Sequence, residues 1–451
     1  MGGEWLMTTL GGGPLEIIDG DRGANYPKQQ DFATTGHCLF LNAGNVTTNG
    51  FNFSDCAFIS AEKDSVLRKG KLRRNDIVLT TRGTVGNVAY FDKSVPYDHI
   101  RINSGMVIFR VQPKELWPRF LYLFLRSFIF RSQVESLRTG SAQPQLPIRD
   151  INQIKIPVPP LKEQQAIACI LGALDDKIEL NRRMNRTLEE IARAIFKSWF
   201  VDFDPVHAKA AVRSAHLGWT NEQISRAACP NLKPEIAALF PDSFEDSELG
   251  EIPKGWEVKP LEEIAEFLNG LALQEYPPRD GRALPVIKIA QLRKGDTQGA
   301  DLCSADLPSE YIVNDGDTLF SWSGSLECVI WTGGKGGLNQ HLFRVTSDDY
   351  PKWFLYFWIH EHLPEFRYIA SSKATTMGHI QRHHLHEAKV VVPSAQVMEP
   401  ANAAIALYFE QILQLRLQSR TLAALRDALL PKLISGELRV PDAERIVGRA
   451  L

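Results

Sequence analysis

Two long stretches of the chain carry apolar residues at spacings of three and four and are nearly free of glycine and proline. The first seam consists of Ile167, Leu171, Leu174, Ile178, Asn181, Leu188, Ile195 and Trp199. The second seam consists of Ile405, Tyr408, Ile412, Leu415, Leu422, Leu425, Leu429 and Leu433. Each pattern predicts a helix of about 35 residues, which spans roughly 50 Å. Because a narrow apolar stripe needs a partner, we predict that the two helices pair as an antiparallel coiled coil.

Asn181 is the polar residue in the first seam. A polar seam residue can fix the register of a helix pair. Alternatively, the Asn181 side chain turns sideways to solvent, and the pattern leaves both possibilities open.

The two halves of the chain resemble each other. A shift of 234 residues places Phe120-Leu121-Tyr122 on Phe354-Leu355-Tyr356, and this register persists from about residue 109 to about residue 188. Upstream the shift becomes 241, which matches Gly83 with Gly324, and then about 250, which matches Gly20 with Gly270. An ordered set of matches over most of both halves indicates an internal duplication, with loop insertions where the shift changes.

Each copy alternates strand-like and helix-like segments. Branched and aromatic residues precede a glycine turn at 77–81 and 318–321, and further strands are predicted at 154–158 and 389–392. Aromatic-rich segments at 116–130 and 353–362 have helical period. The second copy also has a predicted helix over Leu261–Asn269, before Gly270. The fold class is therefore α/β (mixed α+β), with two tandem domains alternating with two long helices.

The predicted boundaries follow from these patterns. They are 1–159 for the first domain, 160–204 for the central helical region, 205–250 for a connector, 251–393 for the second domain, 394–440 for the C-terminal helical region and 441–451 for a tail. The connector is rich in proline and acidic residues, and we expect one or two short helices in it, such as Pro234–Phe240.

The composition is that of a folded protein outside the membrane. Apolar residues make up 44% and charged residues 23%, and the net charge of −2 means that any DNA-binding surface must be local. No apolar run is long enough to span a bilayer, and no signal peptide is recognisable. The six cysteines form no C-x-x-C pair, which argues against a disulfide framework or zinc knuckle and favours the cytoplasm.

Catalytic motifs are absent from the sequence. The Gly333–Gly337 segment around Lys335 lacks the ending of a phosphate-binding loop, and no dinucleotide, nucleophile-elbow or amino-methylation motif occurs. The histidines His379, His383, His384 and His386 suggest a metal, but the matching segment of the first copy has no histidine. Surface histidines, or contacts near DNA phosphates, account for them better. We therefore expect no catalytic, cofactor or metal site.

Several strings resemble type I restriction-modification specificity subunits. They are Ile154 to Ile167 (IKIPVPPLKEQQAI), Leu174 to Asn181 (LDDKIELN), Trp199 to Pro205 (WFVDFDP), Ser247 to Trp256, and Leu430 to Leu438 (LPKLISGEL). The resemblance covers nearly the whole chain.

The resemblance implies a non-catalytic subunit with two target recognition domains, each reading one half of a bipartite double-stranded DNA site. It also implies two modification (methyltransferase) subunits that bind S-adenosylmethionine, and restriction subunits that use ATP and Mg²⁺. The segment Ala395 to Ala404 lacks the Leu-Lys-Glu-Gln-Gln string of the first copy, which puts equal docking of two partners in doubt. An alternative function is a helical scaffold or adaptor without sequence-selective DNA binding.

Candidate DNA contacts are polar and basic residues near the predicted loops. In the first copy they are Arg68, Lys69, Lys71, Arg73, Arg74, Arg82, Thr84, Arg101, Asn103, Ser141, Gln143 and Gln145. In the second copy they are Trp322, Ser323, Lys335, Asn339, Gln340, Lys373, Thr375, Thr376, His379 and Gln381. An ordinary solvated turn is the alternative for the basic segment 68–74.

Overall fold

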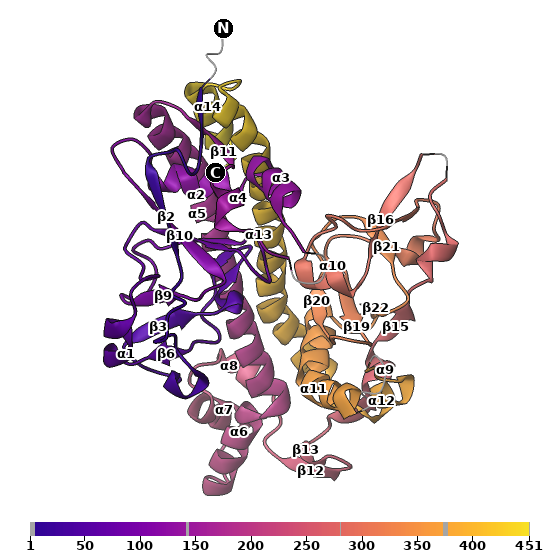
Figure 1. The fold of residues 1–451 in the computed structure, drawn as a ribbon. Helices are drawn as coiled ribbons and strands as arrows, with labels where there is room; N and C mark the ends of the chain where they lie inside the picture. Colours follow the sequence, from indigo (N-terminus) through magenta and orange to yellow (C-terminus); the bar gives the residue numbers. More distant parts are fainter. Residues whose placement is uncertain (1–4, 141–143, 280, 373–377, 451) are drawn as a thin grey trace. The chain divides into compact units, whose positions relative to one another are not determined.

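The computed structural model describes residues 5–140, 144–279, 281–372 and 378–450 (Figure 1). The chain forms two compact units, Met1–Glu179 with Thr421–Leu451 and Leu180–Arg420. The boundary falls within both long helices. Each unit therefore contains one sheet-and-helix domain together with a part of each helix.

The first unit is built on a four-stranded antiparallel sheet in the order β2-β10-β7-β8. Its strands are β2 (Leu15–Asp19), β10 (Met106–Val111), β7 (Ile77–Thr80) and β8 (Val88–Tyr90). A second sheet joins β6 (Phe58–Ile59), β3 (Cys38–Leu41) and β9 (Ile100–Ile102), and two pairs join β1 (Leu6–Thr9) with β11 (Lys155–Val158) and β4 (Val46–Thr47) with β5 (Gly50–Phe51). The helices are α1 (Ala61–Val66), α2 (Pro118–Arg126), α3 (Phe128–Leu137), α4 (Ile148–Ile151) and α14 (Val440–Gly448).

The second unit repeats this plan with the sheet order β15-β22-β19-β20. These strands are β15 (Glu266–Asn269), β22 (Leu342–Thr346), β19 (Thr318–Ser321) and β20 (Cys328–Ile330). A second sheet joins β17 (Leu302–Ser304), β16 (Ala283–Ile287), β21 (Gly336–Leu338) and β18 (Ile312–Val313), while β14 (Glu257–Pro260) pairs with β23 (Lys389–Val392). The helices of this domain are α9 (Leu261–Ile264), α10 (Ile289–Lys294), α11 (Lys352–Ser372) and α12 (Arg382–Glu387).

The strand pairings confirm the duplication. In the first unit, β2 pairs antiparallel with β10, which also pairs with β7. In the second unit, β15 pairs antiparallel with β22, which also pairs with β19. The peripheral sheets share a parallel pair, β3 with β9 and β16 with β21. Two halves of low identity thus have one topology, because the matching apolar and glycine positions specify the same strands and turns.

One predicted helix is wrong. Leu261–Asn269 is not helical throughout, because α9 ends at Ile264 and Glu266–Asn269 is strand β15. Leucine, glutamate and alanine favour a helix locally, but β15 pairs with β22, and Phe267 is buried in the core. Tertiary pairing here overrides the local helix propensity.

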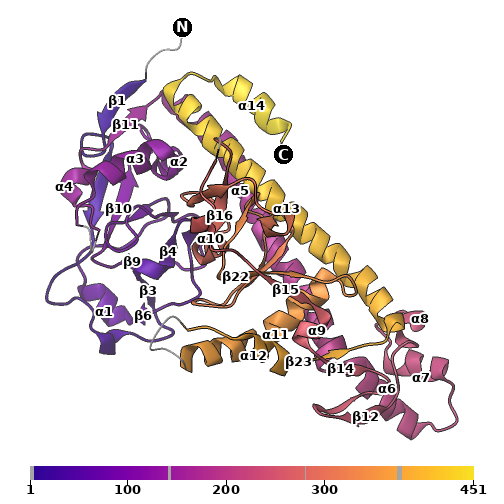
Figure 2. The ribbon, with the colours of Figure 1, turned by 90° about the vertical axis from the view of Figure 1, so that its right-hand side faces the viewer.

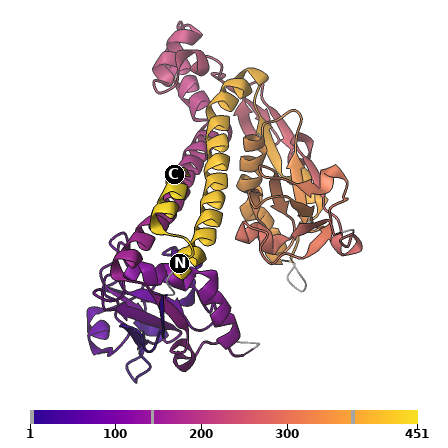
Figure 3. The ribbon, with the colours of Figure 1, turned by 90° about the horizontal axis from the view of Figure 1, so that it is seen from above.

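The two long helices form as predicted and lie side by side (Figure 3). They are α5 (Leu161–Phe196), of 36 residues, and α13 (Ala395–Ser435), of 41 residues. In the first unit, Ile167, Leu171, Leu174 and Ile178 of α5 share one core with Leu422, Leu429 and Leu433 of α13. In the same unit, Arg426 pairs with Asp175 at 2.6 Å, and α14 covers the end of α13 with Ala443 and Val447 (Figure 2).

Asn181 lies in the seam and not at the surface. Its side chain is fully buried, and its Nδ2 donates to Gln418 Oε1 at 2.8 Å and Ser419 Oγ at 3.3 Å within the second unit. Nearby, Arg416 pairs with Glu189 at 3.5 Å. The solvent-facing alternative for Asn181 is therefore wrong. An apolar residue opposite Asn181 could not accept the hydrogen bonds that its Nδ2 donates, so the seam contains a specific polar contact.

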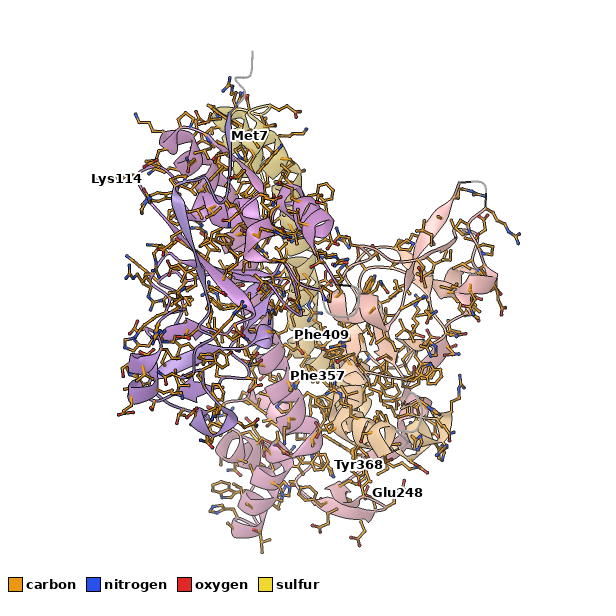
Figure 4. All side chains as sticks on the ribbon, viewed as in Figure 1. Met7, Lys114, Glu248, Phe357, Tyr368 and Phe409 are labelled. Carbon is orange, nitrogen blue, oxygen red and sulfur yellow. The ribbon has the colours of Figure 1, made fainter. Side chains whose placement is uncertain are left out.

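Aromatic packing closes the core of the second unit. The Phe357 ring of α11 lies 5.2 Å from Phe196 of α5 and 5.3 Å from Phe409 of α13, measured between centroids (Figure 4). Because large aromatic side chains bury much area, this cluster ties the domain to its helix segments.

The connector is more structured than expected. It contains three helices and a hairpin, not one or two short helices. They are α6 (Asp204–Ala215), α7 (Asn221–Ala228), α8 (Pro234–Ala237) and the strands β12 (Phe244–Ser247) and β13 (Gly250–Pro253). Lys209 is fully buried here, and its Nζ donates to the carbonyl of Ala237 at 2.9 Å. Of the described helices, none is long and apolar enough to cross a membrane.

Gln164 joins the start of α5 to the first domain. Its buried amide accepts from the Trp117 N–H at 2.8 Å and donates to the carbonyls of Glu115 and Pro159 at 3.0 and 2.8 Å. At the shift of 234, the second copy has Met398 in place of Gln164 and Pro351, which has no N–H, in place of Trp117. The second copy therefore lacks both the side-chain amide of Gln164 and the N–H group of Trp117 that donates to it.

We expect Gln164→Met to lower the free energy of unfolding of the first unit by about 2 kcal/mol, because it leaves a buried N–H and two carbonyls without partners. Chemical denaturation measures the change. The reciprocal variant Met398→Gln is the matched control. A loss for Gln164→Met below about 0.5 kcal/mol would contradict the role assigned to this amide.

Candidate nucleic-acid interface

Three predicted segments of the first unit meet at the end of strand β7. The Thr81 carbonyl accepts from Leu146 N at 2.9 Å, and the N–H groups of Thr81 and Arg82 donate to Gly105 O at 2.8 and 3.2 Å. Arg82 also forms a β-bridge with Gln145. We call residues 82–84, 103–105 and 139–145 the first loop cluster; its residues 141–143 are not among those described.

The second unit forms the same arrangement at the end of β19. The Trp322 carbonyl accepts from Ile380 N at 2.9 Å, its N–H donates to His341 O at 3.4 Å, and Ser323 forms a β-bridge with His379. We call residues 322–324, 339–341 and 378–381 the second loop cluster. The two clusters share these backbone contacts, so the duplication extends to the candidate interface.

A repeated glycine sets the backbone beneath each cluster. A Cβ atom at Gly20 would lie 2.2 Å from the Asn103 carbonyl oxygen, and one at Gly270 would lie 2.3 Å from the Asn339 carbonyl oxygen. No side chain fits at such distances. The match between Gly20 and Gly270 therefore reflects close packing of the strand end against the central turn of each cluster.

The side chains on this shared backbone differ. Arg82 is exposed, and among the described residues none pairs with its guanidinium; Thr84 is also exposed, whereas Asn103 and Gln145 are half-buried. In the second cluster Trp322 is half-buried, and its Nε1 donates to Asn269 Oδ1 at 3.0 Å and Gln340 O at 3.1 Å. The Trp322 ring lies 5.6 Å from the His341 ring and 6.2 Å from that of His379. One cluster thus presents a guanidinium, and the other an indole flanked by imidazoles.

The basic segment 68–74 lies beside strand β9, where Lys71 forms a bridge with Arg101. The side chains of Arg68, Lys69 and Arg73 are exposed. Arg74 pairs with Asp98 at 2.7 Å, and Lys71 with Asp64 at 2.5 Å. Among the described residues, carboxylates therefore already pair with Lys71 and Arg74, and the positive charges that remain for another partner are those of Arg68, Lys69 and Arg73.

Asp21 anchors the start of the same segment. Its carboxylate accepts from the N–H groups of Gly23 at 2.8 Å and Arg68 at 2.7 Å. These hydrogen bonds, that of Gly23 foremost, lower the pKa of Asp21, so the carboxylate that holds the segment stays ionised.

The DNA contact predicted for Arg101 is wrong. Its side chain is 6% exposed and pairs with Asp64 at 2.5 Å. Its NH1 donates to Lys69 O at 2.7 Å and its NH2 to Asp64 O at 2.8 Å and Leu67 O at 3.1 Å. The guanidinium therefore stabilises the fold and does not face solvent.

Ser323 and Asn339 are also buried, and their side chains shape the cluster instead of facing a ligand. Ser323 Oγ lies 3.0 Å from His341 Nδ1, and Asn339 Oδ1 accepts from His341 N at 3.3 Å. The contacts predicted for these two side chains do not fit their positions.

The remaining predicted residues are exposed, half-buried or outside the described residues. Lys335 and Gln381 are exposed, while Gln340 and His379 are half-buried. The predicted contacts outside the described residues are Ser141, Gln143, Lys373, Thr375 and Thr376. Among the other histidines, His383 and His386 are exposed, but His384 is buried, so its assignment as a surface histidine is wrong.

Three further residues that belong to the clusters or contact them were not predicted. They are His341 and Asn269, which contact Ser323 and Trp322, and Arg22, whose NH2 donates to Ser104 O at 3.3 Å. Asn269 directly precedes the repeated glycine Gly270, and Arg22 lies two residues after Gly20. That proximity was the signal that could have found them.

The family model of the type I restriction modification DNA specificity domain matches residues 15–190 and 253–425. The chain belongs to this family. It is a DNA specificity subunit of type I restriction-modification systems with two tandem recognition domains, one in each matched segment.

Curated relatives support the assignment over most of the chain. The specificity subunit of the restriction enzyme HindI from Haemophilus influenzae is 26% identical, over 93% of this chain and 98% of the relative. The MjaIX specificity subunit from Methanocaldococcus jannaschii is 28% identical, over 82% and 79%. A crystal structure of the S subunit from M. genitalium covers 95% of this chain and 96% of its own at 15% identity, with a TM-score of 0.48.

Proposed function

We propose that each unit of this specificity subunit reads one half of a bipartite DNA site through its loop cluster. The observation that carries the proposal is that one backbone arrangement, repeated in both units, holds different side chains. A shared backbone with different polar groups is what two readers of different sequences require, because sequence is read by side-chain groups at base edges.

The first loop cluster has the chemistry for direct readout. Arginine pairs with the O6 and N7 atoms of guanine, and glutamine with N6 and N7 of adenine. Arg82 and Gln145 lie side by side in a β-bridge, and Arg82 is exposed. The exposed Arg68, Lys69 and Arg73 contribute phosphate contacts, which position the subunit without selecting a sequence.

The chain contributes recognition and no catalytic centre or reaction cofactor. It works in the cytoplasm with modification subunits that bind S-adenosylmethionine and with restriction subunits that use ATP and Mg²⁺. The relatives named as specificity subunits of restriction enzymes support such a complex. The absence of the Leu-Lys-Glu-Gln-Gln string from Ala395 to Ala404 supports unequal docking of partners at the two helical regions.

Mapping of methylated bases tests the proposal. Genomic DNA from cells that express this chain with modification subunits should carry methylation at a two-part sequence separated by a fixed gap. A scaffold without sequence-selective binding predicts no such motif. Absence of a motif while the assembled complex can be purified would overturn the proposal.

We expect Arg82→Ala to change only one of the two half-sites (blocks) of the methylation motif. In that half-site the discrimination against the wrong base should fall by about 1–3 kcal/mol. This corresponds to about fivefold to 160-fold in binding of the cognate half-site. Quantitative binding to duplexes altered in one block at a time measures it. The control is Arg226→Ala, which removes an exposed connector arginine paired with Glu222. Equal weakening on all sequences would show that Arg82 contacts phosphate and reads no base.

A further inference from the structure

A hollow of about 430 Å³ opens beside the first loop cluster in the first unit. Its aromatic lining consists of Tyr26, Phe32 and Phe40. Asn103 of the cluster also lines it, and the Ser104 N–H donates to the Tyr26 hydroxyl oxygen at 3.4 Å. The volume falls within the range of small-molecule sites, about 300–1,000 Å³. The hollow is therefore large enough for a flat ring and continuous with the surface proposed to face DNA.

The three rings are inclined to one another. The Phe40 side chain of strand β3 is buried, and the rings of Tyr26 and Phe32 lie 5.7 and 5.6 Å from its ring between centroids. The interplanar angles are 83° and 56°. Tyr26 and Phe32 are half-buried, so part of each side chain is accessible. Accessible aromatic rings stack with nucleobases, because every base has a flat π-face.

Hydrogen bonds fix the loop that carries the two outer rings. Asp31 lies between them in the sequence, and its carboxylate accepts from the Lys28 N–H at 2.7 Å and pairs with Lys63 of α1 at 3.0 Å. The Tyr26 N–H donates to the Gly23 carbonyl at 3.0 Å. The fold itself therefore holds the rings in place.

Two asparagine amides supply hydrogen-bond donors at the hollow. Asn42 Oδ1 accepts from the Gly44 N–H at 2.7 Å, and Asn103 Oδ1 accepts from the Gly105 N–H at 2.8 Å. Each turn thus uses the carbonyl oxygen of its amide, and among the described residues none accepts from the Nδ2 group of either side chain. A nucleobase carries the matching acceptors, ring nitrogens and carbonyl oxygens, along its edges.

The second unit has a buried aliphatic core at the equivalent place. Phe40 pairs with Arg101 in the parallel strand pair of the first unit, and Val286 pairs with Gly337 in that of the second. The residues that share a buried core with Val286 are Leu273, Cys303 and Leu307. An aromatic ring of the first unit is thus replaced by an aliphatic side chain in the second, as expected of a contact that only one half-site needs.

We propose that this hollow holds one nucleobase that leaves the DNA stack in or next to the half-site that the first unit reads. The proposal rests on the proposed function, because the first loop cluster has to bring the duplex to the hollow. The base stacks on Tyr26 or Phe32 and accepts hydrogen bonds from Asn42 and Asn103. Stacking and edge contacts offset the cost of unpairing the base, which is smallest where the base pair is already mismatched.

Duplexes with a single mismatch test the proposal on the full chain assembled with modification subunits. At each position of this half-site and the adjoining gap, the base on one strand is kept and its partner is changed. We expect one position at which the mismatch tightens binding about tenfold, because the duplex no longer holds the base. A base read inside the groove should lose affinity instead, since a mismatch there weakens binding.

Two variants assign the gain to the hollow. Phe32→Ala removes a stacking surface, and Asn42→Asp keeps the acceptor for the Gly44 N–H but lacks the Nδ2 donor. Both should reduce the gain to less than about twofold, since alanine substitution of a stacking ring costs about fivefold or more. The added charge of Asn42→Asp weakens all duplexes alike and cancels in the ratio of mismatched to matched binding. The matched control is Phe128→Ala, whose side chain on α3 is 80% exposed and outside the hollow, and it should keep the gain.

A base that the modification subunits extrude for methylation should also respond to a mismatch. Its response should persist in Phe32→Ala, which separates it from the base in the hollow. Circular dichroism shows whether each variant is folded. If Phe32→Ala unfolds, Asn42→Asp still decides the question, because Asn42 is exposed.

Two results would overturn the proposal. One is the same mismatch profile at every position in the wild type and in both variants. The other is saturable binding of a free deoxynucleoside that Phe32→Ala removes, without any mismatch effect that depends on Phe32, which would assign the hollow to a free ligand. Equal binding of cognate and scrambled half-sites by the wild type would instead contradict the proposed function, so the two failures are distinguishable.

Discussion

Replacing Arg101 with alanine should lower the free energy of unfolding of the first unit by about 3–5 kcal/mol. The Arg101 and Asp64 side chains are only 6% and 5% exposed, and they pair at 2.5 Å. Removing the guanidinium leaves Asp64 charged and buried, with Lys71 as its remaining close cation. Three backbone carbonyls also lose the donors that Arg101 provides. The loss combines an unpaired buried charge with unsatisfied polar groups.

Urea denaturation followed by circular dichroism measures this loss. The matched control is Arg138→Ala, which breaks an arginine–glutamate pair whose side chains are 47% and 59% exposed. A surface pair of that kind contributes less than about 1 kcal/mol. Similar losses in both variants would contradict the structural role of Arg101 and reopen its assignment to DNA binding.

Asp64 also makes the stability of the first unit depend on pH. Burial raises the pKa of this carboxyl, but hydrogen bonds from Lys71 and Arg101 outweigh burial and lower it from 3.8 to about 2. Because the folded pKa is the lower one, the contribution is complete above about pH 4 and is lost as the pH falls through about 2. It amounts to about 2 kcal/mol. In acid unfolding curves, Asp64→Asn should flatten the wild-type slope between these pH values; an unchanged slope would contradict the shift.

The parts of the fold with strong periodicity could be predicted from the sequence. The seams of α5 and α13 and the strands before the glycine turns follow from side-chain patterns that a chain shows locally. The shift of 234 residues predicted the shared topology because each domain buries the same positions. The helix over 261–269 failed because the partner strand β22 lies more than 70 residues away in sequence, and local propensity carries no information about it.

The candidate interface could be predicted as a set of loops but not residue by residue. Arg82, Gln145, Trp322 and His379 do meet in the two loop clusters, since the repeat placed them after equivalent strands. Arg101 was misassigned because a basic residue on a short strand has the same sequence signal whether it faces solvent or Asp64. Only the position of Asp64, 37 residues earlier, decides between the two.

Replacing Gly270 with alanine should remove recognition of one half-site and leave the other unchanged. A Cβ at Gly270 would lie 2.3 and 2.5 Å from the Asn339 carbonyl oxygen and carbon and 2.5 Å from the Leu338 carbonyl oxygen. These are main-chain atoms, so the side chain cannot be accommodated by a rotamer change, and the turn that carries Gln340 and His341 must move. We expect a stability loss of about 3 kcal/mol, at the upper end of overpacking costs.

The reciprocal variant, Gly20→Ala, should affect the other half-site through the same clash, because its Cβ would lie 2.2 Å from the Asn103 carbonyl oxygen. Gly218→Ala is the control, since a Cβ there meets no atom within 4 Å. Binding to duplexes with one intact and one scrambled block separates the effects of the two glycines. If either variant weakened both blocks equally at a temperature where it stays folded, the loop clusters would not be independent readers. If each variant abolishes recognition of a different block, the two loop clusters above the repeated glycines each read one half-site.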